Sequence, residues 1–348
     1  MQVSETRAEE TRITNGLTGL LGIRLPIIQA PIGGASSAQL VAAVSNAGGL
    51  GVLAASWRSP SDLRTELRKI TELTDRPFGV NFVLEWDPQQ GLSVCADYGV
   101  PVVSFFWGDP IPHVSGLHER GVIVMHTVGC AREAAECAAG GVDVIVAQGW
   151  EAGGHVWGRV GSLALVPAVV DAVTPVPVVA AGGIGDGRGL VAALALGASG
   201  IWLGSRFVAT VESAAHPEYK QRILDAAEDD TECTTLFDEG WRDAPHRVLK
   251  NSTLRDWSDA GRPRRGSRPG EGQAVAHLGD GTPILRYGDS EPTEGMVGDL
   301  DARAMYAGQS SGLVKQLLPV ESVMRSLIDE ARTAVESASR LLTVSPLQ

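Results

Sequence analysis

Short apolar runs of four to six residues recur along the first two thirds of the chain, and a longer amphipathic segment follows each of them. The apolar runs do not alternate with polar residues, which is typical of strands that are buried on both faces of a parallel sheet. We predict eight strands, at Ile27–Ala30, Leu50–Leu53, Phe78–Phe82, Val102–Phe105, Val122–His126, Val142–Ala147, Val178–Ala181 and Gly200–Leu203.

Helical periodicity fills the segments between these runs, and an eighth helix is expected to begin after Gly204. Regular alternation of eight strands with helices fits a closed barrel better than a doubly wound sheet, which is the competing fold. We therefore expect an α/β TIM (β/α)8 barrel with an inserted small subdomain and C-terminal helices. The first seven helices are predicted at Ser37–Ala47, Pro60–Leu73, Pro88–Tyr98, Pro110–Arg120, Cys130–Ala139, Leu163–Val173 and Asp186–Leu196.

The pattern changes at residues 227–301, which are rich in charge, Gly and Pro and carry no long periodic helix. We assign 1–226 together with 302–348 to the barrel and its C-terminal helices, and 227–301 to an insertion or lid. Short strands are expected at Ala274–Leu278 and Pro283–Arg286. The helical period returns later, and Val320–Leu342 is predicted to be one amphipathic helix.

A basic, turn-rich stretch lies inside the insertion at Arg262–Pro269. A solvated surface loop is the favoured interpretation, and a docking site for an acidic partner is the alternative.

Composition narrows the range of functions. The net charge of the 348 residues is −12 and the pI is about 5.1, so a basic footprint for nucleic acid is absent. No apolar run approaches the roughly 18 residues of a membrane span. The N-terminus is polar and lacks the apolar core of a signal peptide, and the four cysteines form no CxxC pair. These features predict a cytoplasmic location and no membrane partner.

The segment AQGWEAGGH at 147–155 carries the most specific signal. It follows a predicted strand, and it brings a glycine pair and a histidine to the C-terminal tip of that strand, where TIM barrels place their active sites. Glycines allow backbone to approach a flat ligand closely, and an imidazole moves protons near neutral pH. His155 is therefore the candidate catalytic residue.

Two glycine-rich loops follow the last two barrel strands, and such loops commonly bind phosphate with help from a helix N-terminus. Gly182 and Gly183 lie in the first loop, and Gly204 lies in the second beside the hydroxyl of Ser205. Either pair could instead serve only a tight turn. The two loops together predict a phosphate site.

Polar or glycine-rich tips follow two further strands. The tip of the first strand has Pro31 before a glycine pair, which leaves room for a flat ring. Asn81 ends the third strand and could hydrogen-bond a heterocycle, or cap a turn.

The remaining histidines give weaker signals. His126 ends a strand on the functional face and could line the site or lie in the core. No HxH or HExxH spacing occurs, so we expect no metal site. The other five histidines are expected to be solvated, and these are His113, His118, His216, His246 and His277.

Taken together, these segments resemble the nitronate monooxygenase family, also called 2-nitropropane dioxygenase. The similarity extends from Leu20 to about Phe207 and resumes at YAGQSSG, 306–312. The segments that carry it are QAPI at 29–32, GVNF at 79–82, AQGWEAGGH at 147–155, AGGI at 181–184 and LGSRF at 203–207.

The resemblance implies a TIM barrel with non-covalently bound FMN at the C-terminal ends of the strands. Two departures from the family pattern stand out, because Ile32 replaces the usual methionine and the segment 227–301 is longer than in compact members. By resemblance, Ala30, Pro31 and Ile32 line the flavin ring, Asn81 and Gln148 hydrogen-bond it, Gly153 lies near it, Gly182, Gly183, Gly204 and Ser205 hold the phosphate, and His155 is the active-site histidine.

The activity that the resemblance implies is oxidation of an alkyl nitronate by FMN and O2 to a carbonyl compound and nitrite. The partners would then be a nitronate or nitroalkane and O2, and a homodimer is one option for the assembly. His155 could act as a neutral base or, as a cation, hold the nitronate oxygens. Two alternatives are an FMN-dependent NAD(P)H enoyl-thioester reductase and a non-catalytic barrel that binds a phosphate ligand.

Overall fold

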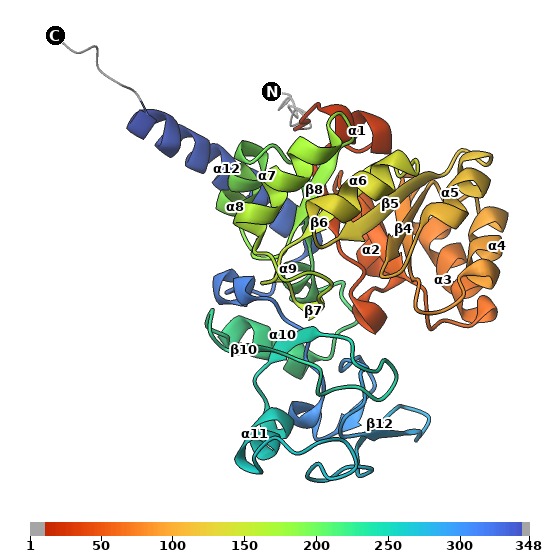
Figure 1. Ribbon diagram of the computed structural model, residues 1–348, viewed down its shortest axis with the longest axis vertical. Coiled ribbons are helices and arrows are strands. Elements are labelled where there is room, and N and C mark those ends of the chain that lie inside the picture. The colour runs from red at the N-terminus through yellow and green to blue at the C-terminus, as the bar shows by residue number, and fades with distance from the viewer. Residues whose placement is uncertain (1–10, 343–348) are drawn as a thin grey trace, which may run out of the picture.

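A ring of eight parallel strands forms the centre of the computed structural model, which describes residues 11–342 (Figure 1). The hydrogen-bonded order is β1-β9-β8-β6-β5-β4-β3-β2, and a parallel bridge between Ile28 and Leu50 joins β1 to β2 and closes the ring. The predicted TIM barrel is confirmed. Its strands are β1 (Ile27–Gln29), β2 (Gly51–Ala54), β3 (Phe78–Val83), β4 (Val102–Phe106), β5 (Ile123–Val128), β6 (Val144–Gln148), β8 (Val178–Ala181) and β9 (Gly200–Leu203).

Helices surround the ring, and local signals set their ends. Ser37 and Ser59 accept backbone N–H groups at two helix starts, and Gly48 and Gly197 take positive φ where two helices turn back into strands. The first seven predicted helices are present, as α2 (Ala38–Asn46), α3 (Pro60–Leu73), α4 (Gln89–Asp97), α5 (Ile111–His118), α6 (Ala131–Ala139), α7 (Ser162–Val173) and α8 (Gly187–Ala195).

The eighth position in the helix ring is filled by a distant part of the chain. The helix expected after Gly204 is only the single turn α9 (Ser205–Val208). The long helix α12 (Val320–Leu342) instead packs between α8 and α2. Its bounds match the prediction, but its place beside the first and last barrel helices was not apparent from the sequence.

Successive side chains along each strand point alternately into the barrel and toward the helices, and this separates two apolar layers. On β6, Val144 and Val146 pack inside the barrel, whereas Ile145 and Ala147 face the helices. The short helix α1 (Gly16–Leu21) adds buried Leu17 to the inner cluster. Because the same alternation continues to the strand tips, it decides which tip residues face the barrel axis.

A smaller lobe lies beneath the barrel in Figure 1. Its strands at 274–277 and 283–285 confirm the two short strands expected there. Its apolar core also contains Tyr219 and Met305, which lie on either side of the assigned 227–301 segment. Those boundaries remain a prediction. The lobe contains α10 (Pro217–Asp225), β10 (Thr231–Thr234), β11 (His246–Leu249), α11 (Ser252–Asp259), β12 (Ala274–His277), β13 (Pro283–Leu285) and β14 (Val297–Gly298).

Several contacts tie this lobe to the barrel, and two of them lie beside the strand tips. The two-residue strand β7 (Gly154–His155) pairs antiparallel with β11. From the lobe, the buried carboxylate of Glu291 accepts the backbone N–H of Ala35, near the tip of β1, at 3.1 Å.

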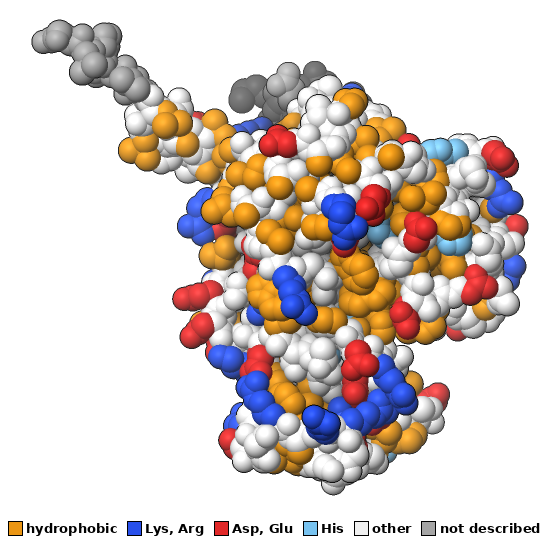
Figure 2. Space-filling view, in the orientation of Figure 1, with side chains coloured by type: hydrophobic (Ala, Val, Ile, Leu, Met, Phe, Trp, Pro, Cys, Tyr) orange, Lys and Arg blue, Asp and Glu red, His pale blue; other side chains and the backbone are white. Residues whose placement is uncertain are grey.

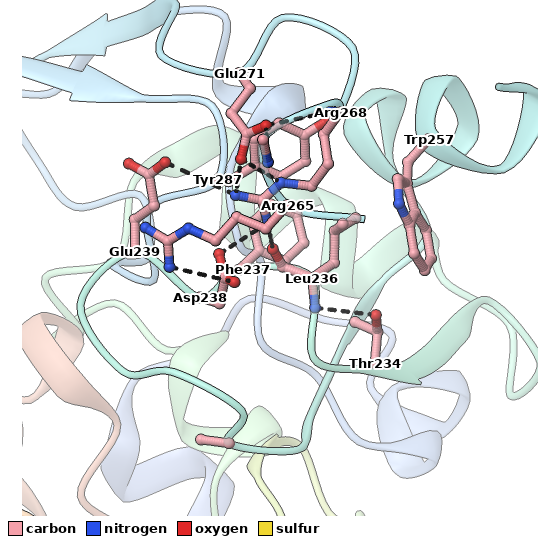
Figure 3. Close-up of polar contacts among 12 residues, drawn as sticks. Thr234, Leu236, Phe237, Asp238, Glu239, Trp257, Arg265, Arg268, Glu271 and Tyr287 are labelled. Atoms are coloured by element: carbon pink, nitrogen blue, oxygen red, sulfur yellow. Dashed lines mark hydrogen bonds and ion pairs between the residues drawn. The ribbon is translucent and has the colours of Figure 1, made fainter. Parts of the chain in front are cut away.

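The basic stretch at 262–269 is only partly the solvated loop that we expected. Basic side chains gather over the lobe in Figure 2, but the Arg268 side chain is only 3% exposed. Its guanidinium pairs with Asp238 at 2.8 Å and Glu271 at 2.6 Å and lies over the Tyr287 ring (Figure 3). The sequence pattern missed this because Asp238, from a distant segment, joins the nearby Glu271 in neutralising the charge.

In the part of the chain that the structure describes, no helix is both long enough and apolar enough to pass through a bilayer.

Candidate active site

A cavity of about 580 Å³ opens at the C-terminal ends of the barrel strands. Its volume is in the range of small-molecule and cofactor sites. Barrel loops and the smaller lobe both contribute to its walls. All the site residues expected from the sequence line it, namely Ala30, Pro31, Ile32, Asn81, Gln148, Gly153, His155, Gly182, Gly183, Gly204 and Ser205.

Strand alternation carries polar side chains to the cavity floor. Asn81, Thr127 and Gln148 are the inward-facing polar residues near the tips of β3, β5 and β6. Asn81 is 4% exposed, and its Oδ1 is buried without a hydrogen-bond partner. A buried amide oxygen without a partner is costly, so this atom is suited to accept a hydrogen bond from a ligand.

The amide of Gln148 holds the loop that presents the histidine. Its Nε2 donates to the carbonyl of His155 at 3.0 Å, and its Oε1 accepts the N–H of Trp157 at 3.0 Å. Gln148 thus fixes the backbone on both sides of residue 156, and one Nε2 hydrogen remains for a ligand.

His155 is half-buried, and its ring stacks on Trp241 with centroids 4.1 Å apart. Burial, with a smaller contribution from neighbouring His246, holds the pKa of His155 well below its usual range. Its Nε2 is buried and has no hydrogen-bond partner within residues 11–342. The imidazole is therefore neutral at physiological pH and has a ring nitrogen available for proton transfer.

His246 was expected to be solvated, and that expectation is wrong. The residue is fully buried on β11, directly opposite His155, and the two rings are 5.3 Å apart. Burial lowers the pKa of His246 to about 4. His126 faces the helix layer as a core residue and does not line the cavity.

The glycine pair after β8 is shaped by its contact with the 149–152 loop. Gly182 has φ +91° and Gly183 has φ +71°, a region that side-chain-bearing residues rarely adopt. A Cβ on Gly182 would lie 3.0 Å from the carbonyl oxygen of Gly149, and one on Gly183 would lie 2.9 Å from Cγ of Glu151. These two positions require glycine.

The helix N-terminus expected to help bind phosphate is already occupied. Asp186 caps α8 by accepting the N–H groups of Arg188 and Gly189, and Glu330 accepts that of Gly187. An anion at this end of the cavity would therefore depend on the loops and not on α8.

The loop after β9 leaves space at the same end of the cavity. A Cβ on Gly204 would lie 3.7 Å from Ile32 and 3.9 Å from Ala30, so glycine keeps this part of the wall open. The hydroxyl oxygen of Ser205 accepts the N–H of Gly308 at 3.0 Å, which leaves its own hydrogen free to donate to a ligand.

Several lining residues come from the smaller lobe, and the sequence analysis did not single them out. Trp241, Asp289 and Glu291 follow turn-like sequences that are typical of solvated loops. Burial raises the pKa of Asp289 to about 6 and also raises that of Glu291. Only the tertiary contact with the barrel shows that these residues face a cavity.

Tyr306 begins the second block of family resemblance and also lines the cavity. Its hydroxyl donates to the backbone carbonyl of Asp289 at 2.5 Å, and its ring centroid is 5.4 Å from that of His155. This hydrogen bond links the YAGQSSG segment to the lobe wall.

A family model described as nitronate monooxygenase matches residues 14–91 and 85–330. The nitronate monooxygenase of Pseudomonas aeruginosa is 34% identical over 92% of this chain and 100% of its own. The (3aS,4S,5R,7aS)-5-hydroxy-7a-methyl-1-oxo-octahydro-1H-indene-4-carboxyl-CoA dehydrogenase of Mycobacterium tuberculosis is 34% identical over 95% of this chain and 99% of its own.

Among solved structures, FabK from Thermotoga maritima superposes with a TM-score of 0.80 and 33% identity, covering 95% of this chain and all of FabK. The barrel, the lined cavity and these full-length similarities agree with one another. The chain belongs to the nitronate monooxygenase family of oxidoreductases.

Proposed function

We propose that this protein binds FMN at the C-terminal face of the barrel and uses O2 to oxidise alkyl nitronates to carbonyl compounds and nitrite. The observation that carries the proposal is the imidazole of His155, which is neutral and has a buried Nε2 without a partner in the cavity. Membership of the family supports the same reaction class.

The residues around the cavity fit a flavin. Asn81 offers an unpartnered acceptor to a ring N–H, and the backbone at Gly204 borders open space, with no described atom within 3.4 Å of an added Cβ. When bound, FMN would supply the electron transfer and the reaction with O2. The holding residues would be Ala30, Pro31, Ile32, Asn81, Gln148 and Gly153 at the ring, and Gly182, Gly183, Gly204 and Ser205 at the phosphate.

His155 would act as the base when the substrate is a neutral nitroalkane. In the tautomer that carries its proton on Nδ1, Nε2 can accept the α-proton and so generate the nitronate. Because burial strongly disfavours the imidazolium, the alternative role as a cation that holds nitronate oxygens receives less support.

A second candidate is a flavin-dependent reductase or dehydrogenase that acts on a thioester with NAD(P)H. The carboxyl-CoA dehydrogenase of M. tuberculosis, which aligns over 99% of its own length, favours this candidate, as does the superposition on FabK. A histidine that transfers a proton serves either reaction.

Product analysis separates the two candidates. The purified flavin-loaded protein is incubated with primary and secondary nitronates in air while nitrite and O2 uptake are measured, and with NADH or NADPH under anaerobic conditions while flavin bleaching is followed. Nitrite release with slow bleaching by both nicotinamides supports the monooxygenase. Rapid bleaching without nitrite release contradicts it.

The role of His155 is tested by His155→Asn. We expect turnover of a neutral nitroalkane to fall by roughly 100-fold or more, the usual contribution of a general base. Turnover of the preformed nitronate should fall far less. Equal losses on both substrates would rule out proton abstraction by this imidazole.

A further inference from the structure

Six aromatic side chains form a continuous row that starts beside His155 and runs out of the cavity. At its centre, Trp241 lies edge-on to Trp86 at 5.2 Å and to Trp107 at 4.7 Å, measured between ring centroids. Trp57 extends the row beyond Trp86, and Trp157 extends it beyond Trp107. We call Trp57, Trp86, Phe106, Trp107, Trp157 and Trp241 the aromatic wall.

The topology of the barrel explains how this wall is assembled. Trp57, Trp86 and Trp107 each follow the tip of a consecutive strand, β2, β3 and β4, so they meet at one rim. Trp157 follows β7, and Trp241 is brought from the smaller lobe. Five of the eight tryptophans of the chain thus belong to the aromatic wall, and three of these, Trp57, Trp86 and Trp241, line the cavity.

The two ends of the wall are exposed, whereas Trp241 at its centre is only 3% exposed. Trp57 is 57% exposed and Trp157 is 37% exposed, although indoles bury large apolar areas when they stabilise a fold. Exposed apolar patches of this kind, next to a cavity, mark ligand surfaces.

Backbone strain at Trp107 is a separate observation that points the same way. This bulky residue has φ +64°, in the left-handed region that residues other than Gly, Asn and Asp rarely occupy. Such conformations cost about 1–3 kcal/mol and persist where the surroundings hold a side chain for a function. Here the strained residue places its indole between Trp157 and Trp241.

The charge of the lining completes the description of the ligand. Among the described residues that line the cavity there is no Lys or Arg, and the two carboxylates, Asp289 and Glu291, lie in the lobe wall. The aromatic wall itself carries no charged side chain, so an uncharged ring can stack on its indoles.

We propose that the aromatic wall binds an uncharged ring-sized apolar body of the substrate, which selects bulky cyclic or aryl substrates over short alkyl ones. This inference rests on the proposed function, under which the substrate is a nitronate attached to such a ring. The reactive group points to His155 and the ring lies along Trp241, Trp86 and Trp57.

Binding of inert nitro compounds tests the wall without any turnover. Nitrobenzene and 2-methyl-2-nitropropane both lack an α-proton, so neither can form a nitronate. Isothermal titration calorimetry on the flavin-loaded protein should give at least about tenfold tighter binding of nitrobenzene. Equal affinities would overturn the proposal.

Trp57→Leu is the informative variant, because the residue is 57% exposed and its replacement should leave the circular dichroism spectrum of the fold unchanged. We expect the affinity for nitrobenzene to fall about five- to tenfold while that for 2-methyl-2-nitropropane changes less than about twofold. The matched control is Trp257→Leu, in the smaller lobe outside the cavity, which should change neither affinity. A Trp57→Leu protein that binds both ligands like the wild type contradicts the proposal.

A kinetic comparison keeps this inference separate from the proposed reaction. Wild-type kcat/KM should favour the nitronate of phenylnitromethane over ethyl nitronate, and Trp57→Leu should reduce that ratio. If no nitronate is oxidised but nitrobenzene still binds selectively through Trp57, the proposed reaction is wrong and the proposed ring-binding role of the aromatic wall is supported. If nitronates are oxidised without any preference for ring-bearing substrates, the proposed role of the aromatic wall is wrong and the proposed reaction is supported.

Discussion

Replacing Arg268 with alanine tests whether a buried ion cluster positions the active-site wall. The Arg268 guanidinium pairs with Asp238 and Glu271 and donates to the carbonyl of Leu236 at 3.0 Å. These contacts anchor residues 236–239, which directly precede Gly240 and the indole that stacks on the catalytic candidate. Loss of the guanidinium should therefore affect both stability and ligand binding.

The expected loss of stability follows from the two carboxylates, of Asp238 and Glu271, that lose their cationic partner in Arg268→Ala. Removing one partner of a buried pair typically costs about 3–5 kcal/mol, because the remaining charges lose their compensation. The Asp238 and Glu271 side chains are 15% and 19% exposed, so water would screen part of this penalty. We expect a decrease of roughly 2–4 kcal/mol in the free energy of unfolding.

Urea titration followed by far-ultraviolet circular dichroism measures this decrease, and calorimetry with nitrobenzene measures the effect on the wall. Arg265→Ala is the matched control, because Arg265 is 43% exposed and reaches only Asp238 at 3.6 Å. Exposed pairs of this kind contribute about 0–1 kcal/mol. Equal, small losses for Arg268→Ala and Arg265→Ala, with unchanged nitrobenzene affinity, would refute the reasoning.

Two further predictions concern pH and the glycine pair. Burial lowers the pKa of His126 from 6.5 to about 4, so the stability that its neutral form contributes is present above pH 6.5 and is lost as the pH falls toward 4. His126→Gln should therefore reduce, by roughly 3 kcal/mol, the decrease in the free energy of unfolding between neutral pH and pH 4. Urea titrations at several pH values measure this decrease, and an unchanged pH profile would contradict the prediction. Gly182→Ala adds a Cβ at φ +91° that lies 3.0 Å from a carbonyl oxygen, so the protein should lose most of its flavin on desalting, as judged by visible absorbance. The control Gly121→Ala has φ +71° with open space around the added Cβ, and equal flavin retention in both variants would show that the cavity contact is unimportant.

The barrel could be predicted because its signals are local. Apolar runs such as 178–181 and 200–203, with glycines where helices turn back into strands, identify each unit without knowledge of its neighbours. Strand tips of a parallel barrel converge on one face, so the residues at those tips, His155 among them, could be predicted to share a cavity.

The interpretations that failed concern residues whose surroundings come from elsewhere in the chain. Arg268 and His246 lie in polar, turn-rich sequence, and their burial depends on Asp238 for Arg268 and on the pairing of β11 with β7 for His246. The position of three tryptophans directly after β2, β3 and β4 could have indicated that they lie at the cavity rim. Trp241 lies in the smaller lobe, and nothing in its local sequence indicates that it joins them.

The sequence by itself determined the number and order of the barrel units and the glycines and histidine at the strand ends, because periodicity and turn chemistry act over a few residues. The tertiary structure alone decided that α12 completes the helix ring and that the smaller lobe supplies Trp241 and Glu291 to the cavity. Such contacts depend on packing between segments more than one hundred residues apart, and no local pattern encodes which surfaces meet.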